Sequence, residues 1–170
     1  MNKILVKEEL KEKLEALRLQ GKKIAFTNGC FDILHVGHVR YLREAKNSAD
    51  ILVLALNSDN SVRSIKGEKR PLTPEEERAE ILAALESIDF VTVFPELTPL
   101  ELICYLQPDI LIKGGDWPEE KIVGRDEVKK WGGRVIIIPE VKDKSTTNIV
   151  EKIKRVYCPD KSAPGTPPVG

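Results

Sequence analysis

The chain has 170 residues, 41% hydrophobic and 32% charged, which is typical of one globular domain and excludes a disordered or membrane-spanning protein. Its 27 basic and 27 acidic side chains cancel, which excludes a general attraction to nucleic acid or to an anionic membrane. The longest apolar run, residues 51–56, is far shorter than the roughly 20 residues that cross a bilayer. No signal segment opens the chain, so we expect a cytoplasmic protein without nucleic-acid or membrane partners.

The first predicted element is an amphipathic helix over residues 7–19, where leucines recur at helical spacing and Gly21 follows the end. We therefore expect residues 1–22 to form an N-terminal helix that packs on the main domain. Residues 158–170 are rich in Pro, Gly and Ser and are predicted to be a disordered tail. The main domain is then expected to span residues 23–157.

Within that domain, apolar segments rich in β-branched residues alternate with helical patterns. Strands are predicted at 24–27, 51–56, 90–94, 109–112 and 134–138, and helices at 38–47, 74–86, 98–105, 124–131 and 146–156. The apolar runs are nearly continuous, as expected of strands buried on both faces. This alternation predicts βαβ units and therefore a doubly wound, Rossmann-like α/β fold with five parallel strands.

Ligands of such sheets bind beyond the carboxyl ends of the strands. Four polar segments follow predicted strands here: residues 28–38, 57–70, 113–117 and 142–147. The first contains both histidines of the chain, His35 and His38, at the predicted start of a helix, where free backbone N–H groups and the helix dipole favour phosphate. Gly37 between them allows a ligand to approach the backbone. The alternative is a glycine turn followed by two surface histidines.

The other three segments each have a functional and a structural interpretation. Residues 60–71 are basic and contain Gly67, which predicts either a solvated loop or a mobile lid that closes over phosphate. Residues 113–117 are either a glycine turn with a surface aspartate or a nucleotide contact. Ser145 or Thr146 is expected to cap the last helix, and a capped helix start can also bind phosphate.

The three cysteines are odd in number and widely spaced, which argues against a disulfide framework or a zinc site. Cys104 lies in an apolar stretch, so we expect it in the core. No carboxylates have the spacing of metal ligands, and we therefore predict no metal site made by the protein alone.

Residues 27–38 (TNGCFDILHVGH) resemble the signature of the H-x-G-H nucleotidyltransferase superfamily, whose members have a cytidylyltransferase-like α/β fold. Within it, the chain resembles the branch of heptose 1-phosphate adenylyltransferases that make ADP-heptose. The matching stretches are Asn57-Ser58-Asp59, Lys66-Gly67, Arg70-Pro71, Lys113-Gly114-Gly115-Asp116 and Ser145-Thr146-Thr147-Asn148-Ile149. Cys30 also fits this branch, whereas Asp143 stands where the family commonly has glycine.

The resemblance implies that a heptose 1-phosphate attacks the α-phosphorus of ATP, which yields ADP-heptose for the lipopolysaccharide core and pyrophosphate. The implied catalytic residues are His35, His38 and Lys66. The implied nucleotide contacts are Asn28, Gly29, Cys30, Phe31, Gly37, Arg78, Lys113, Gly115, Asp116, Ser145, Thr146 and Thr147. The implied contacts to the sugar phosphate are Asp32, Asn57, Asp59 and Arg70.

Mg²⁺ is the expected cofactor, held mainly by the phosphates, with Asp32 either contacting it or orienting a turn. A separate sugar kinase is expected in the pathway, and a homodimer is compatible with the sequence. One alternative is a cytidylyltransferase acting on glycerol 3-phosphate or a related acceptor. The other is a nucleotide-binding module without catalysis, which would bind ATP but release no pyrophosphate.

Overall fold

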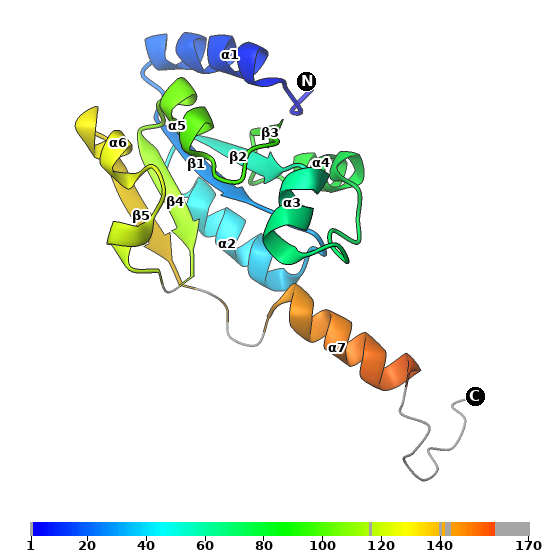
Figure 1. The fold of residues 1–170 in the computed structure, drawn as a ribbon. Helices are drawn as coiled ribbons and strands as arrows, with labels where there is room; N and C mark the ends of the chain where they lie inside the picture. The colour runs from blue at the N-terminus through cyan, green and yellow to red at the C-terminus, as the bar shows by residue number, and fades with distance from the viewer. Residues whose placement is uncertain (1, 116, 140, 142–143, 159–170) are drawn as a thin grey trace.

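The computed structural model describes residues 2–115, 117–139, 141 and 144–158. Five parallel strands form its sheet: β1 (Ile24–Gly29), β2 (Ile51–Asn57), β3 (Phe90–Phe94), β4 (Ile110–Gly114) and β5 (Arg134–Ile138). Their order is β3-β2-β1-β4-β5, and Figure 1 shows helices on both faces. The predicted doubly wound α/β fold is therefore confirmed.

Most of the helices pack on one face or the other of this sheet. They are α1 (Lys7–Leu19), α2 (Val36–Lys46), α3 (Asp59–Lys66), α4 (Glu75–Ala83), α5 (Leu100–Leu106), α6 (Arg125–Lys130) and α7 (Thr146–Tyr157), with a 3₁₀ turn at Glu119–Lys121. One buried cluster joins α1, α5 and α6 to strand residues such as Phe26 and Leu111. The other joins α2 and α4 to Ala25 and Ile112. Neighbouring residues of each strand thus enter opposite cores, as the two-residue period of a strand requires.

Helix α3 occupies part of residues 60–71, which we expected to form a solvated loop or a mobile lid. Ser58 begins it by accepting a hydrogen bond from the Ser61 backbone N at 3.2 Å, and Gly67 ends it at φ 94°. Ser61 and Val62 are buried, so the segment contributes to the core although its composition is polar. Residues 60–66 of the segment expected to be a solvated loop or a mobile lid are therefore helical.

Helix α5 also corrects a detail of the predicted core. Its inner side packs Leu102, Ile103 and Leu106 against the sheet, whereas Cys104 is exposed. A short helix in an apolar stretch still has an outer side, and Cys104 lies on it. The expectation that Cys104 belongs to the core was wrong.

The two ends of the chain differ in how they meet the sheet. Helix α1 packs on α5, and Ile4 forms a parallel bridge with Val91 of the edge strand. Helix α7 points away from the domain in Figure 1, and none of its residues is buried. No helix in the described ranges is long and apolar enough to cross a membrane. The predicted tail beyond Cys158, together with Asp116 and Asp143, lies outside the described residues.

Candidate active site

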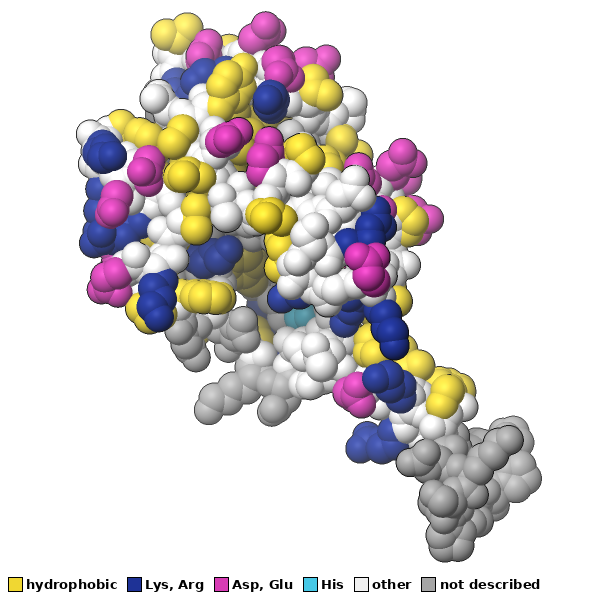
Figure 2. All heavy atoms as spheres, viewed as in Figure 1, with side chains coloured by type: hydrophobic (Ala, Val, Ile, Leu, Met, Phe, Trp, Pro, Cys, Tyr) yellow, Lys and Arg dark blue, Asp and Glu magenta, His cyan; other side chains and the backbone are white. Residues whose placement is uncertain are grey.

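A cavity of about 800 Å³ lies at the carboxyl ends of the strands, where the fold predicts a ligand. Figure 2 shows basic and apolar side chains bordering this hollow, with a histidine at its base. Predicted site residues that line it are Asn28, Gly29, Cys30, Phe31, Asp32, His35, Gly37, His38, Asn57, Lys66, Arg70, Lys113, Ser145, Thr146 and Thr147. The tertiary structure therefore brings together residues from all four predicted segments.

The two histidines meet at the first turn of α2. His35 is the N-cap residue, and its ring stacks on that of His38 with 3.8 Å between the centroids. Phe31 contacts the His38 ring edge-on, with 5.1 Å between the ring centroids. The first turn of α2 carries no acidic side chain, so the positive end of its dipole stays available to an anion.

The surroundings of His38 favour the neutral form of its ring. Burial, reinforced by neighbouring His35, lowers the pKa of His38 from 6.5 to about 4. Its buried Nδ1 has no hydrogen-bond partner among the described residues. A polyanion beside this ring would reverse the electrostatic balance and favour the protonated, hydrogen-bond-donating form.

Two glycines in this loop are required by packing. A Cβ on Gly29 would lie 2.8 Å from the Phe31 ring, and one on Gly37 would lie 2.9 Å from the His35 ring. A Cβ on Gly37 would also come within 3.2 Å of the Lys144 Cβ. These glycines therefore let the aromatic rings settle against the backbone, a reason for Gly37 beyond the predicted approach of a ligand.

The start of α7 faces the same loop. The Ser145 hydroxyl accepts a hydrogen bond from the Asn148 backbone N at 3.1 Å, which confirms the predicted cap. The Thr146 hydroxyl donates to the Ile33 carbonyl at 3.4 Å, and Lys144 lines the cavity beside it. Two helix N-termini thus border one end of the cavity, an arrangement suited to phosphate groups.

Asp32 anchors the chain segment between α3 and α4. Its carboxylate accepts hydrogen bonds from the backbone N of Leu72 at 2.7 Å and of Thr73 at 3.0 Å, and it pairs with Arg70. The structure therefore supports the turn-orienting interpretation of Asp32. In this arrangement Arg70 is held at the wall of the cavity by that carboxylate.

Arg78 and Asp59 lie behind the wall and do not line the cavity. The Arg78 side chain is 0% exposed and pairs with the Asp59 carboxylate at 2.7 Å. It also donates to the carbonyls of Cys30 and Thr73, at 2.5 Å and 2.9 Å. Arg78 thus joins the histidine loop, α3 and α4, and the structure does not place it against a ligand in the cavity.

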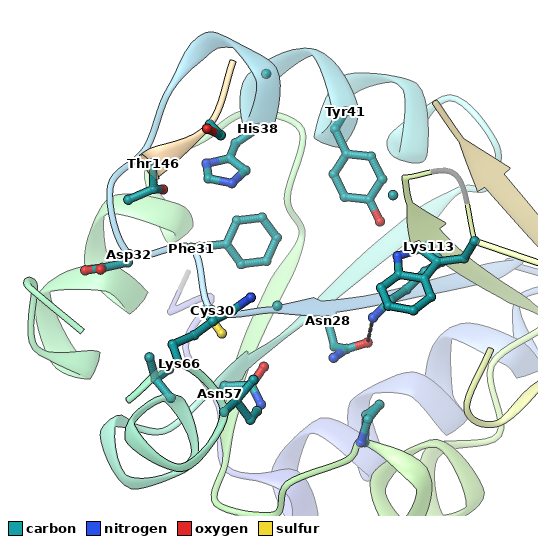
Figure 3. A pocket seen from close by; sticks show the side chains of 18 of the residues that line it. Asn28, Cys30, Phe31, Asp32, His38, Tyr41, Asn57, Lys66, Lys113 and Thr146 are labelled. Atoms are coloured by element: carbon teal, nitrogen blue, oxygen red, sulfur yellow. Dashed lines mark hydrogen bonds between the residues drawn. The ribbon is translucent and has the colours of Figure 1, made fainter. Parts of the chain in front are cut away.

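The remaining flank of the cavity lies on the other side of the sheet. Asn28 and Lys113 come two residues after Phe26 and Leu111, so they project toward the α5 side, away from α2. Lys113 Nζ lies 3.5 Å from the Asn28 carboxamide oxygen, the contact dashed in Figure 3. Burial, reinforced by Lys66, lowers the Lys113 pKa, whereas Cys30 opposes that shift. Gly115 does not line the cavity.

Sequence reasoning missed several lining residues. Leu97, Thr98 and Pro99 follow strand β3, whose carboxyl end we had not counted among the polar segments, although the same strand-end rule applies to it. Tyr41 follows His38 by three residues, so helical spacing could have identified it. Trp117 belongs to the predicted segment 113–117 but was not among the predicted site residues. It lines the cavity together with Lys121, Ile122 and Val123.

Metal binding by the protein alone finds no support in the described part of the chain. No group of three His, Cys, Asp or Glu side chains there could hold a metal ion.

Similar proteins add an independent line of evidence. A model of the Cytidylyltransferase-like family matches residues 26–152. The bifunctional protein HldE of Syntrophotalea carbinolica is 58% identical over 156 residues, which are 92% of this chain and 32% of that protein. That of Geobacter metallireducens is 60% identical over 144 residues, covering 85% of this chain and 29% of its own. The chain thus spans about a third of the length of these relatives.

Solved structures share the fold. The lipopolysaccharide core biosynthesis protein from Thermoplasma volcanium has a TM-score of 0.60 and 28% identity, covering 73% of this chain and all of its own. Pantothenate synthetase from Thermus thermophilus has a TM-score of 0.62 and 16% identity, covering 91% of this chain and 70% of its own. The second likeness concerns the fold alone. Because the family match includes the histidine loop, the sheet and the start of α7, this chain belongs to the cytidylyltransferase-like family of nucleotidyltransferases.

Proposed function

We propose that this chain transfers the adenylyl group of ATP to a heptose 1-phosphate and so forms ADP-heptose for the lipopolysaccharide core. The observation that carries the proposal is the cavity onto which the N-termini of α2 and α7, His38 and Lys66 converge. Similarity to HldE proteins and to a lipopolysaccharide core biosynthesis protein supports the choice of acceptor. The chain has no net charge, but Lys66, Lys113 and Lys144 line this cavity and would attract two phosphorylated substrates.

The chemistry requires positioning and charge stabilisation and needs no protein nucleophile. A phosphate oxygen of the acceptor forms a bond to the α-phosphorus while the bond from that phosphorus to the bridging oxygen breaks, and pyrophosphate leaves. His38, protonated once the triphosphate is bound, would donate a hydrogen bond to the departing oxygen. Lys66, at the end of α3, would offset the negative charge on the phosphates.

The two substrates would occupy different flanks of the cavity. The triphosphate fits the side of α2 and α7, where His38, Thr146 and Lys144 lie. We assign Lys113 and Asn28 to the acceptor phosphate, in place of the nucleotide that the resemblance implies, because both lie on the α5 side, away from His38. The indole of Trp117 on that side offers an apolar wall to a sugar ring. Figure 3 shows His38 and Thr146 apart from Asn28 and Lys113, with Lys66 and Asn57 on a third side.

The surroundings of the reaction are part of the same proposal. Mg²⁺ would be held chiefly by the ATP phosphates and would neutralise charge on them, since Asp32 is already engaged with Arg70 and two backbone amides. A sugar kinase would supply the heptose 1-phosphate in the cytoplasm. The exposed Ile153, Val156 and Tyr157 of α7 favour a homodimer, which sedimentation velocity would detect as a doubled mass.

A substrate panel tests the activity. The purified chain is mixed with Mg²⁺, ATP or CTP, and either heptose 1-phosphate or glycerol 3-phosphate, and pyrophosphate release is measured. We expect release only with ATP and heptose 1-phosphate. Faster release with CTP and glycerol 3-phosphate would assign the chain to the cytidylyltransferase alternative. ATP binding without release on any acceptor would identify a non-catalytic module.

A further inference from the structure

Tyr41 links helix α2 to the two central strands of the sheet. It follows His38 by three residues, so both side chains project from one side of α2, toward the strand ends (Figure 3). The Tyr41 hydroxyl lies 2.5 Å from the Thr27 hydroxyl of β1 and donates to the Ile112 carbonyl of β4 at 3.4 Å. One hydroxyl therefore connects the histidine helix to β1 and to β4.

The surroundings of the Tyr41 ring fit this side chain closely. A Cβ on Gly114 would lie 3.1 Å from the Tyr41 ring, so a larger residue at the end of β4 would crowd the ring. Burial raises the pKa of Tyr41 to about 12, which keeps its hydroxyl protonated at neutral pH. Either hydroxyl can donate in the contact between Tyr41 and Thr27, and when Thr27 donates, the Tyr41 proton is available to the Ile112 carbonyl.

The contacts of His38 complete the arrangement. Its ring is confined laterally by His35 and Phe31. Those contacts do not determine where α2 stands relative to the strand ends, whereas the Tyr41 hydroxyl contacts both strands directly. Its loss would let α2 shift, and His38 would move with the helix because it lies one turn earlier.

We propose that Tyr41 is a positioning residue that sets the place of His38 over the triphosphate, through its hydrogen bonds to Thr27 and Ile112. The inference rests on the proposed adenylyl transfer for its kinetic consequence. Its structural consequence, the environment of the His38 ring, is independent of the acceptor. Tyr41 itself would touch no reacting atom in the proposed reaction.

Replacing Tyr41 by Phe and Thr27 by Val removes the hydroxyls and keeps the shapes. We expect kcat to fall about tenfold in Tyr41→Phe with the KM for ATP nearly unchanged, since a displacement of roughly an ångström can cost up to about a hundredfold. Thr27→Val should show a smaller loss in the same direction. The double variant should resemble Tyr41→Phe, because both substitutions remove one shared interaction.

NMR titration of His38 separates positioning from a general loss of stability. In the free variant we expect the His38 pKa to rise from about 4 toward 6.5, as the ring becomes less buried. Tyr105→Phe, on the exposed part of α5, is the matched control and should leave both kcat and this pKa unchanged. If Tyr41→Phe does not fold, Thr27→Val provides the same test.

An unchanged His38 pKa in the folded variants would overturn the inference, whether or not kcat falls. An unchanged kcat beside a changed pKa would overturn it as well. Absence of turnover by the wild-type chain with heptose 1-phosphate would instead refute the proposed function. The inference would then be decided by the His38 pKa, measured without substrate.

Discussion

At the scale of single residues, the site depends on a histidine whose charge follows its ligand. Free His38 is neutral because it is buried and because His35 lies beside it. The same position at the start of α2 becomes favourable for an imidazolium once phosphates arrive. Because negative charge grows on the departing oxygen during the proposed reaction, a hydrogen bond from His38 to that oxygen would stabilise the transition state more than the bound substrates.

Replacement of His38 by alanine should therefore separate rate from binding. Loss of one donor to developing charge typically costs about 3 kcal/mol, so we expect kcat to fall by roughly a hundredfold or more. Steady-state kinetics gives kcat, and isothermal titration with ATP should show affinity within a fewfold of the wild type. Turnover close to the wild-type value would remove His38 from the mechanism.

The lowered pKa of His38 also predicts how stability depends on pH. Between pH 6.5 and 4 the unfolded chain protonates this side chain while the folded chain keeps it neutral. The free energy of unfolding should consequently decrease as the pH falls through that range. Urea denaturation of wild type and His38→Asn should show the variant gaining relative stability toward pH 4. A pH-independent difference between the two proteins would contradict the neutral state of His38.

At the scale of elements, the connection from α3 to α4 is anchored at one end. Asp32 holds the segment around Arg70, Leu72 and Thr73, while α3 is capped by Ser58 and partly buried. The chain between Lys66 and Arg70 lies between these two fixed points. The closing movement predicted for residues 60–71 would therefore involve only a few residues around Gly67.

Bound ATP should protect this short connection. Trypsin is expected to cut after Lys66 or Lys69 in the free protein and more slowly with ATP, because phosphate draws Lys66 into the cavity. Mass spectrometry of the fragments identifies the cleavage sites. Lys66→Met, examined at Lys69, should lose much of the protection. Equal cleavage with and without ATP would refute the closing movement.

At the scale of the whole molecule, the sheet would keep the two substrates of the proposed reaction apart. Strand alternation sends Asn28 and Lys113 toward the α5 face, while α2 and α7 present their N-termini from the other side. The reacting phosphates would then meet over the strand ends, where neither substrate blocks the other.

A pair of lysine substitutions tests this separation. A charge-assisted hydrogen bond is worth roughly 1.5–3 kcal/mol, or about 10- to 100-fold in affinity. Lys113→Met should raise the KM for the sugar 1-phosphate by that factor and change the KM for ATP little. Lys144→Met, on the α7 side, should show the reverse pattern with a smaller effect because its side chain is exposed. The same profile for both variants would refute separate flanks.

The sequence by itself determined the sheet, because five nearly continuous apolar runs that alternate with helical patterns indicate parallel strands covered on both faces. It also located most of the cavity, since strand ends, His35 and His38, and the cap at Ser145 are local signals. Helix α3 was not predicted because few of its residues are buried and its composition is polar. Tertiary structure alone decided that Arg78 lies behind the wall with Asp59, and that Asp32 holds the segment after α3. The same is true of Tyr41 reaching both β1 and β4, since each contact joins segments whose separation only folding removes.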